Sequence, residues 1–396
     1  MTYLKTGEKK DCCGCGSCYN VCNHKAIEMV TDEEGFLFPK KNKNCVNCGL
    51  CENVCPYELD VSSKKDSTLD YPQTYAAYSP KERKYSSSGG VFYELAREII
   101  NQNGTIYGAA FDNAFKLRHF AVNSLEDLHP LRGSKYLQSN TGLCFKEIKN
   151  KVVNNELVLF VGTPCQVAGL KCYLKHDYPS LFTVDVVCHG VPSQWLFDQH
   201  KAYLEKKYKA SLKEYHFRDS NKWGGCEIAI FTNRKKIVNP TYELSPYLYS
   251  FMYGYTFRWS CYECPFSKIP RLGELTLGDY WGVKRVFPNV DSKGGVSVVL
   301  VNNKKGESLL NRIKESLFIR ESCLTDACKE NGNITHHSEV PEIRKRVFQL
   351  LSERGYADLA KKEFRSPKYK SLKRKLYREK YIISPLAKLY RQFFKK

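Results

Sequence analysis

Long hydrophobic segments and export signals are both missing from this sequence. No apolar run in its 396 residues approaches the roughly 18 residues that a membrane-spanning helix needs. The N-terminus, MTYLKTGEKK, is polar and lacks the apolar stretch of a signal peptide. We therefore expect a cytoplasmic protein. Because the cytoplasm is reducing, the 18 cysteines are expected to remain thiols or to bind metal rather than to form disulfides.

Acidic residues are scarce at the C-terminal end. Residues 341–396 contain 18 Lys and Arg but only 5 Asp and Glu, and so carry most of the net charge of +20. Ser384-Pro385 is typical of a helix start, and an apolar stripe follows at helical spacing, formed by Leu386, Leu389, Tyr390, Phe393 and Phe394. Such a basic amphipathic helix suits peripheral contact with an anionic membrane, although it more often docks on protein. For this basic helical tail, residues 340–396, we expect docking and no nucleic-acid partner.

Cysteine, by contrast, is abundant, and eight of the cysteines form two blocks with the same spacing. The spacing C-x-x-C-x-x-C-x-x-x-C begins at Cys12 and again at Cys45. Bacterial two-cluster ferredoxins use this spacing, and the fourth cysteine of each block binds the cluster of the other block. The sequence therefore predicts two [4Fe–4S] clusters, one bound by Cys12, Cys15, Cys18 and Cys55, the other by Cys45, Cys48, Cys51 and Cys22.

Two other uses of these blocks fit less well. Paired C-x-x-C motifs often bind zinc, but a zinc ion takes four ligands from two such motifs, not eight from two runs of four. Disulfides would need an oxidising compartment. Short strands are expected after the first block, in KAIEMV and at the end of DEEGFLF, and Cys13 is left as a spare thiol.

Three short apolar strands further along the chain each lead into a polar motif. The strands are expected at 157–161, 182–187 and 275–278, and the motifs are GTPCQ, CHG and DYWG. Since α/β sheets place ligand sites at the carboxyl ends of their strands, we expect the motifs to share one site. A further strand is expected at 297–301, with a helix from about 306 to 319.

Two segments contain groups that suit an anionic or electron-rich ligand. Ser86-Ser87-Ser88-Gly89-Gly90 precedes a predicted helix from Val91 to Ile100, and serine caps with free backbone N–H groups can bind an anion at a helix start. RGSKYLQSNTG, which begins at Arg132, adds cationic and hydroxyl groups. An ordinary helix cap and a solvated turn are the alternatives.

Four cysteines outside the two blocks come from three separate segments. Cys165 and Cys188 follow two of the predicted strands, and Cys261-x-x-Cys264 lies in RWSCYECPF. Buried structural cysteines usually lie within apolar stretches, which most of these do not. They are candidates for a third metal site, holding either a cubane cluster or zinc.

From about Tyr75 to Asn302 the chain resembles the coenzyme F-420 hydrogenase/dehydrogenase beta-subunit family. The resemblance rests on an ordered series of motifs: YSSSGG, RGSKYLQS, VGTPCQVAGLK, VCHGVPS, FRD, RWSCYEC, TLGDYWG and GGVSVVLV. It implies a flavin-binding body of mixed α/β type, with an N-terminal region at 72–150 and a C-terminal region at 151–330. The two-cluster ferredoxin domain, residues 1–62, would be fused in front of it.

The resemblance also implies cofactors and the residues that hold them. FAD is expected near Ser88, Gly89, Gly90, Lys135 and Thr163. A third [4Fe–4S] cluster beside the flavin is expected on Cys165, Cys188, Cys261 and Cys264.

These expectations describe an iron–sulfur flavoprotein oxidoreductase. Clusters carry one electron at a time and flavin exchanges two as hydride, so the protein would connect a redox partner protein, such as ferredoxin, with a deazaflavin, nicotinamide or other organic acceptor. Lys135 would stabilise an anionic reduced flavin. The sequence contains no obvious catalytic acid or base and leaves the acceptor open. The alternative is a non-catalytic electron-transfer subunit of a larger redox complex that has lost its flavin.

Overall fold

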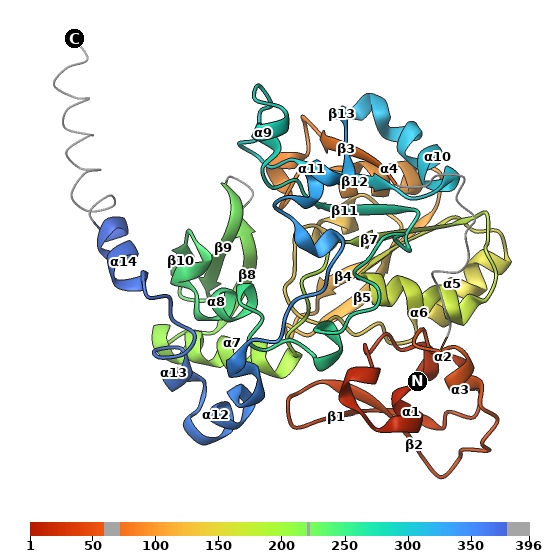
Figure 1. Cartoon of the computed structure of the whole chain (residues 1–396), viewed down its shortest axis with the longest axis horizontal. Helices are drawn as coiled ribbons and strands as arrows, with labels where there is room; N and C mark the ends of the chain where they lie inside the picture. Colours follow the sequence, from red (N-terminus) through yellow and green to blue (C-terminus); the bar gives the residue numbers. More distant parts are fainter. Residues whose placement is uncertain (59–71, 220–221, 378–396) are drawn as a thin grey trace.

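The computed structural model describes residues 1–58, 72–219 and 222–377. These residues form an N-terminal domain, a body built on a large mixed sheet, and a smaller three-stranded sheet next to the C-terminal helices (Figure 1). The predicted mixed α/β class is confirmed. The apolar stripe predicted at residues 386–394 lies outside the described residues.

The N-terminal domain contains the two cysteine blocks and a short hairpin. The hairpin strands pair antiparallel, as the sequence predicts, with Ile27 opposite Lys41. A short helix follows a glycine within each block, Gly16 with φ 85° and Gly49 with φ 74°, conformations that glycine adopts without strain. The two blocks therefore share one local shape. The elements are α1 (Tyr3–Thr6), α2 (Ser17–Val21), β1 (Ile27–Thr31), β2 (Leu37–Lys41) and α3 (Leu50–Asn53).

Eight strands form the sheet of the body, in the order β13-β3-β12-β11-β7-β6-β4-β5. The four strands β11, β7, β6 and β4 run parallel, and the outer strands pair antiparallel on either side of them. The four strands predicted from β6 onward are confirmed to within one residue at each end. The strands are β3 (Gln73–Tyr78), β4 (Thr105–Phe111), β5 (Leu117–Val122), β6 (Val158–Gly162), β7 (Leu181–Val186), β11 (Leu275–Asp279), β12 (Ser297–Val301) and β13 (Phe318–Ser322).

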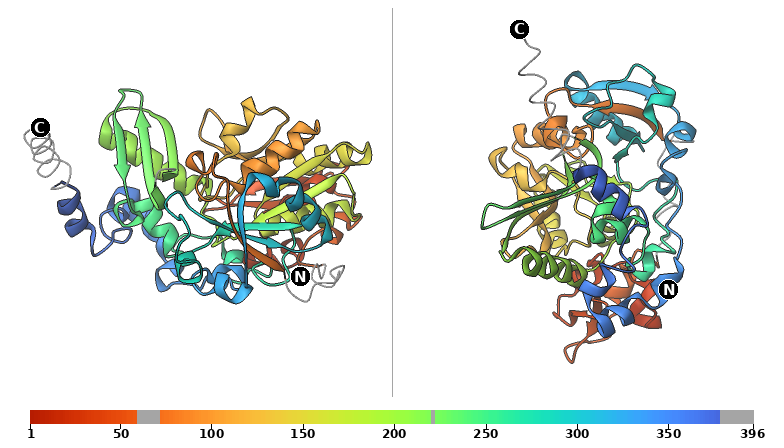
Figure 2. Two further views of the ribbon diagram at one scale, coloured as in Figure 1. Left: turned by 90° about the horizontal axis from the view of Figure 1, so that it is seen from above. Right: turned by 90° about the vertical axis from the view of Figure 1, so that its left-hand side faces the viewer.

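Helices cover both faces of this sheet (Figure 2). α4 (Val91–Asn101) and α10 (Lys304–Ile313) pack on one face, and α5 (Cys144–Val153) and α6 (Pro164–Leu174) pack on the other. Neighbouring residues of β4 show the alternation, because Ile106 lies in the first core and Tyr107 in the second. The N-terminal domain lies below α5 and α6 (Figure 1).

The predicted helix over 306–319 is too long. α10 ends at Ile313, and Phe318 begins strand β13, which pairs with β3. The Phe318 ring stacks on Tyr78 with centroids 4.6 Å apart. Pairing at the sheet edge therefore overrides helical continuation.

A second, aromatic-rich core joins the smaller sheet to the C-terminal helices. This core also includes Phe36 and Phe38 of the N-terminal domain, so the first part of the basic C-terminal segment packs into the protein. None of the described helices has the length and hydrophobicity needed to cross a bilayer. The elements are α7 (Gln194–Tyr208), β8 (Leu212–Asp219), β9 (Lys222–Phe231), β10 (Lys236–Asn239), α8 (Pro246–Met252), α9 (Val283–Val286), α11 (Leu324–Cys328), α12 (Val347–Arg354), α13 (Tyr356–Leu359) and α14 (Tyr369–Tyr377).

Two buried arginines fix the N-terminal domain on the rest of the protein. Arg258 donates from Nε to the carbonyl oxygen of Cys12 at 2.6 Å and from Nη2 to that of Leu37 at 3.0 Å. Arg344 forms a two-pronged pair with the Glu34 carboxylate, at 2.9 and 2.5 Å. Because these guanidinium groups are buried and hydrogen-bonded across the interface, they hold the N-terminal domain in one position on the body.

Candidate metal centres and an adjoining cavity

The first predicted ligand set, Cys12, Cys15, Cys18 and Cys55, lies on the side of the N-terminal domain that faces the body. All four thiols line a small cavity of about 30 Å³. Burial raises the pKa of Cys18, and the neighbouring thiols Cys15, Cys12 and Cys55 raise it further. The structure thus gathers the two blocks as the spacing predicts. We call these four cysteines the inner set.

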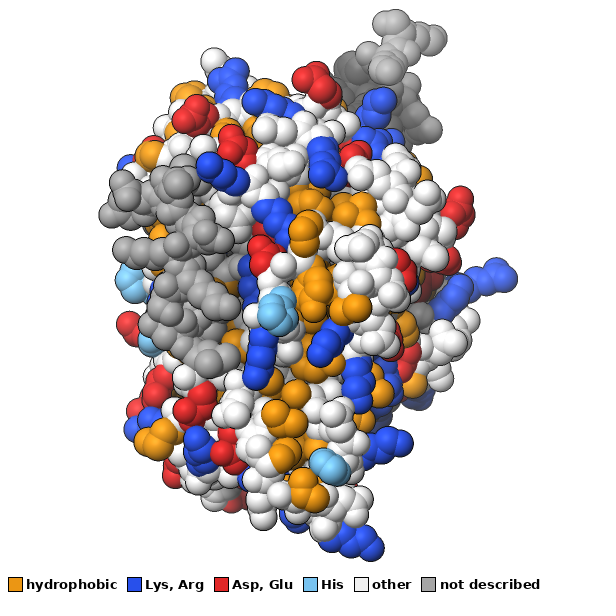
Figure 3. Space-filling model, turned by 90° about the vertical axis from the view of Figure 1, so that its right-hand side faces the viewer, with side chains coloured by type: hydrophobic (Ala, Val, Ile, Leu, Met, Phe, Trp, Pro, Cys, Tyr) orange, Lys and Arg blue, Asp and Glu red, His pale blue; other side chains and the backbone are white. Residues whose placement is uncertain are grey.

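The second predicted set, Cys22, Cys45, Cys48 and Cys51, is more open, and we call it the outer set. Cys48 is exposed, Cys22 and Cys45 are half-buried, and Cys51 is buried. Cys51 and Cys45 both contribute to raising the pKa of the Lys41 ammonium. The Cys22 sulfur accepts a hydrogen bond from the backbone N–H of Ala26 at 3.2 Å. Figure 3 shows hydrophobic side chains at the surface in the lower part of the molecule, where the N-terminal domain lies.

Cys165, Cys188, Cys261 and Cys264, called here the body set, come together from three segments. Cys165 lies in the first turn of α6, whose start is fixed by a capping box between Thr163 and Gln166. Burial raises the pKa of Cys188 to about 12, with contributions from Cys165 and Cys264. Burial and the other three thiols likewise raise the pKa of Cys261. Four thiols from three segments therefore converge here.

A cluster and a single ion differ in how closely they hold their thiolates. Among the described residues, no three His, Cys, Asp or Glu side chains lie close enough together to hold one metal ion. A zinc ion draws its thiolates to about 2.3 Å from one centre, whereas the four thiolates of a cubane bind different iron atoms and lie farther apart. A third cluster on the body set stays a prediction.

Contact between the inner set and the body set was not foreseen from the sequence. The Cys13 thiol lies within hydrogen-bonding reach of both Cys15 and Cys165. Gly169 of α6 leaves room for this approach, because a Cβ atom there would lie 2.7 Å from the Cβ of Cys15. The Ser17 hydroxyl donates to the Gly169 carbonyl oxygen at 2.8 Å. The spare thiol of the first block therefore sits between two candidate centres.

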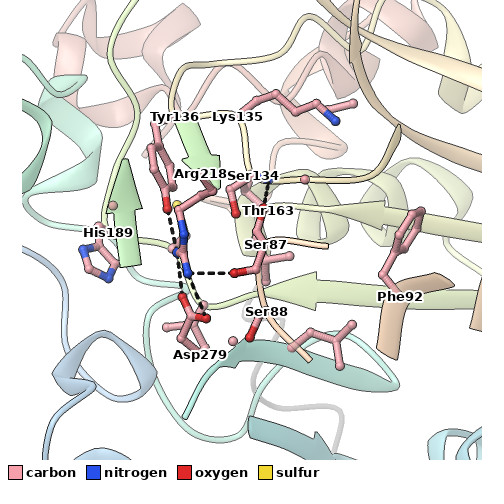
Figure 4. A pocket seen from close by; sticks show the side chains of 18 of the residues that line it. Ser87, Ser88, Phe92, Ser134, Lys135, Tyr136, Thr163, His189, Arg218 and Asp279 are labelled. Atoms are coloured by element: carbon pink, nitrogen blue, oxygen red, sulfur yellow. Dashed lines mark hydrogen bonds and ion pairs between the residues drawn. The ribbon is translucent and has the colours of Figure 1, made fainter. Parts of the chain in front are cut away.

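A cavity of about 670 Å³ opens at the carboxyl ends of β6, β7 and β11, the edge predicted to hold the site. Thr163, Cys188 and Asp279, one from each of the three motifs, line it. Its volume lies in the range of ligand and cofactor pockets. The cavity is therefore a candidate binding site next to the body set (Figure 4).

The serine–glycine segment contributes to the cavity in a different way from the one predicted. Ser88 and Gly90 line the cavity, but the residue that caps α4 is Gly90, with φ 80° and no side-chain cap. Gly89 packs behind the wall, where its N–H donates to the Ser297 hydroxyl at 3.1 Å. A serine cap is thus replaced by a glycine cap, and the serine side chains are left to face the cavity.

Lys135 also lines the cavity. Its amine is directed away from Arg218 and Asp279 (Figure 4). Its Nζ donates to the carbonyl oxygens of Pro130 at 2.7 Å and Arg132 at 2.8 Å. Burial lowers its pKa to about 7, so its charge changes near neutral pH. Gln138, from the same motif, lies at the domain interface instead and donates to the Cys13 carbonyl oxygen at 2.8 Å.

Arg218 and Asp279 form a polar group that no sequence argument had assigned. Arg218 donates from Nη1 to Asp279 Oδ2 at 2.9 Å and to the Tyr136 hydroxyl at 3.0 Å, and from Nη2 to the Ser87 carbonyl oxygen at 2.8 Å. Trp223 Nε1 donates to Asp279 Oδ1 at 2.7 Å. The motifs FRD and TLGDYWG carried the signal, but spacing alone did not show that they meet.

Four buried polar atoms that belong to cavity-lining residues have no hydrogen-bond partner: Thr241 Oγ1 and three nitrogen atoms, His119 Nδ1, Arg132 Nε and Arg218 Nε. Burial lowers the pKa of His119 to about 4, so the ring is neutral at pH 7. Its Nε2 lies 3.2 Å from the Val161 carbonyl oxygen, which places the proton there and leaves Nδ1 as an acceptor. Buried polar atoms are normally satisfied, and these three nitrogen atoms fit a polar ligand. His119 lies within β5, which has no recognisable motif.

Comparison with known proteins agrees with the motifs. The family described as the C terminus of the coenzyme F420 hydrogenase/dehydrogenase beta subunit matches residues 155–327, and the "4Fe-4S dicluster domain" family matches residues 11–59. A comparison with curated proteins gave no match. Among solved structures, a chain of the F420-reducing [NiFe] hydrogenase complex from Methanosarcina barkeri is similar, with 16% identity, a TM-score of 0.44, and coverage of 74% of this chain and 91% of that one.

The predicted resemblance is confirmed. The dicluster domain shows that the protein is an iron–sulfur electron-transfer protein, and its residues 155–327 match the C-terminal family of the coenzyme F420 hydrogenase/dehydrogenase beta subunit.

Proposed function

We propose that this protein is an iron–sulfur flavoprotein oxidoreductase, which passes electrons between its iron–sulfur centres and FAD, and on to a deazaflavin, nicotinamide or other organic acceptor. One observation carries the proposal: the body set and the large cavity share a wall. Cys188 belongs to the body set and also lines the cavity. The Thr163 hydroxyl, on the same wall, lies 3.2 Å from the Cys165 sulfur. A ligand in the cavity would therefore lie beside a cluster bound by the body set, which we call the body centre.

The three thiol sets form a series that ends at this cavity. The outer set, with exposed Cys48, is the one that a redox partner protein can approach. The inner set is covered by the body, and Cys13 connects it to Cys165. Each set supplies the four thiolates that one [4Fe–4S] cluster requires. The order of exposure therefore agrees with entry of electrons at the surface and use of them in the cavity.

The cavity wall contains groups that suit a flavin cofactor. The start of α4 at Gly90 presents backbone N–H groups, which suit phosphate, and the Ser88 hydroxyl lies next to it. The unpaired nitrogen atoms of His119, Arg132 and Arg218 offer one acceptor and two donors to the polar groups of such a cofactor. When bound, FAD would supply the exchange of two electrons as hydride.

Another part of the cavity is lined by aromatic side chains that suit a conjugated acceptor. Trp223 and Trp281 stack with centroids 4.7 Å apart, and the Arg218 guanidinium lies 5.7 Å from the Trp281 ring. The His189 ring lies parallel to Phe251. Such surfaces bind flat rings through stacking, as the ring of a deazaflavin or nicotinamide would require.

Anaerobic purification with iron, acid-labile sulfide and flavin counted per chain tests the proposal. Three clusters with a flavin require about twelve irons and one flavin. Substituting Cys188→Ser should remove about four irons and leave the two ferredoxin-type clusters. About eight irons without flavin would contradict the proposal, and would favour a non-catalytic electron-transfer subunit.

A further inference from the structure

Tyr57 belongs to the N-terminal domain but lies against the body set. It follows Cys55 of the inner set by two residues and lines the small cavity that the inner set surrounds. It also packs against the same buried cluster as Cys165 and Cys264 of the body set. Its ring meets that of Phe266 edge to face, with centroids 5.7 Å apart and planes at 86°. Tyr57 thus lies between two candidate centres that come from different parts of the chain.

The Tyr57 hydroxyl is buried and has no hydrogen-bond partner. The ionisable groups that act on it are all thiols, and three of the four belong to the body set: Cys13, Cys264, Cys165 and Cys261. A phenol O–H normally finds a partner when it is buried, and leaving it without one is destabilising. The hydroxyl is therefore a buried donor that lacks a partner, in a place where body-set thiols are its neighbours.

Sulfur atoms of a cluster would provide that partner. Thiolate and inorganic sulfide both accept hydrogen bonds, and hydrogen bonds to sulfur are one of the factors that set cluster potentials. A hydrogen bond to sulfur stabilises the reduced cluster more than the oxidised one, because the reduced cluster carries an additional negative charge. A donor at this position would raise the reduction potential.

We infer that Tyr57 donates a hydrogen bond from its hydroxyl to a sulfur atom of the body centre, and that the docked N-terminal domain thereby raises the potential of a cluster that it does not ligate. Tyr57 is a positioning residue, since it acts through the cluster and not on substrate. The inference rests on the proposed function, because it requires a cluster on the body set.

Contacts between the first cysteine block and the body connect the position of Tyr57 with domain docking. Gln138 donates to the Cys13 carbonyl oxygen at 2.8 Å, and Thr141 donates to that of Cys15 at 2.9 Å. Both hydrogen bonds join the first cysteine block to the body. Since Cys55 belongs to the same cluster set as Cys15, the segment that carries Tyr57 is held in the same frame.

A redox titration followed by electron paramagnetic resonance tests the inference on the full-length, cluster-loaded protein. Tyr57→Phe removes the hydroxyl and keeps the ring that packs on Phe266. The reduction equilibrium constant of the body centre should fall by about tenfold, which corresponds to about 59 mV for one electron. The centres of the inner and outer sets serve as internal references. Tyr208→Phe, in α7 and outside both thiol sites, is the matched control and should change no potential.

A second measurement does not depend on the potential. The wild type should show a proton coupling to the body centre that disappears on exchange into D₂O, and Tyr57→Phe should lack this coupling. Iron per chain shows whether the variant is fully loaded. An unchanged potential together with an unchanged proton coupling would overturn the inference and leave the proposed function intact. Absence of a third centre from the wild-type protein would overturn both.

Discussion

The inner and outer thiol sets have the same spacing but different surroundings. Backbone carbonyl groups of the first block accept hydrogen bonds from Arg258, Gln138 and Thr141 of the body. In the second block, Val46 and Leu50 beside the exposed Cys48 are themselves 57% and 39% exposed. One block is thus built into a domain interface, and the other forms part of the surface.

On the proposed assignment, spacing determines which cysteines share a cluster, whereas docking determines the surroundings of each cluster. A cluster on the inner set would be shielded from water and close to the body set. A cluster on the outer set would be accessible to a protein partner. Exposure and local charge are among the factors that set cluster potentials, so two identical ligand sets are expected to have different potentials.

Breaking the docking interface should have the largest effect. Arg344→Ala leaves the buried Glu34 carboxylate without its partner, and we expect a loss of about 3–5 kcal/mol in the free energy of unfolding. Lys10→Ala is the control, because Lys10–Glu263 also crosses the interface but is exposed, and should cost at most about 1 kcal/mol. Anaerobic denaturant unfolding measures both. Equal losses would contradict the interface described here.

Separating the inner set from the body set should have the next largest effect. In Gly169→Val, the added Cβ would lie 2.7 Å from the Cβ of Cys15, and we expect a destabilisation of about 1–3 kcal/mol from overpacking. Iron should be lost first from the inner centre. Gly332→Ala is the control, since a Cβ there meets nothing within 4 Å. Thermal unfolding and iron counts with unchanged results for Gly169→Val would rule out the close contact.

Exposure to air tests the difference between the outer and inner sets without a mutation. Because Cys48 is exposed while Cys15 is buried, oxygen and chelators should reach the outer centre first. Its spectroscopic signal should decay several-fold faster than that of the inner centre. Loss of both signals at one rate would show that the surroundings of the two sets do not differ in the way described.

The smallest effect is expected at Lys135. Lys135→Met should lower the reduction potential of the flavin, because a cation near the ring stabilises its anionic reduced form. Burial lowers the pKa of Lys135 to about 7, so the amine is charged below that pH and neutral above it. The difference between the wild type and the variant should therefore be larger at pH 6 than at pH 9. Spectroelectrochemical titration at both pH values measures it, and a pH-independent difference would exclude this role for the amine.

Local patterns in the sequence predicted much of the fold. The parallel strands that carry GTPCQ, CHG and DYWG were recognisable because each is an apolar run that ends in polar residues, and they do share one sheet edge. The helix over 306–319 was overextended because pairing of β13 with β3 is a tertiary contact. β8 and β9 were missed for the same reason: their hydrophobic face is completed by α7 and the C-terminal helices, which are distant in the sequence.

The candidate site shows the same limit. Repeated spacing marked the inner and outer sets, and motif positions marked the body set. His119 and Tyr57 have no local pattern, since their importance comes from where the fold leaves an unpaired buried atom. Gly89 had a conspicuous local pattern, yet the structure places it behind the cavity wall. Sequence patterns therefore identified the ligand types, and only the fold identified the surroundings.

Iron anomalous scattering from crystals grown without oxygen tests the central claim most directly. The account predicts three iron clusters, on the outer, inner and body sets, with the inner cluster between the other two and flavin density in the cavity beside Cys188. Two clusters only, or zinc in place of iron on the body set, would contradict it.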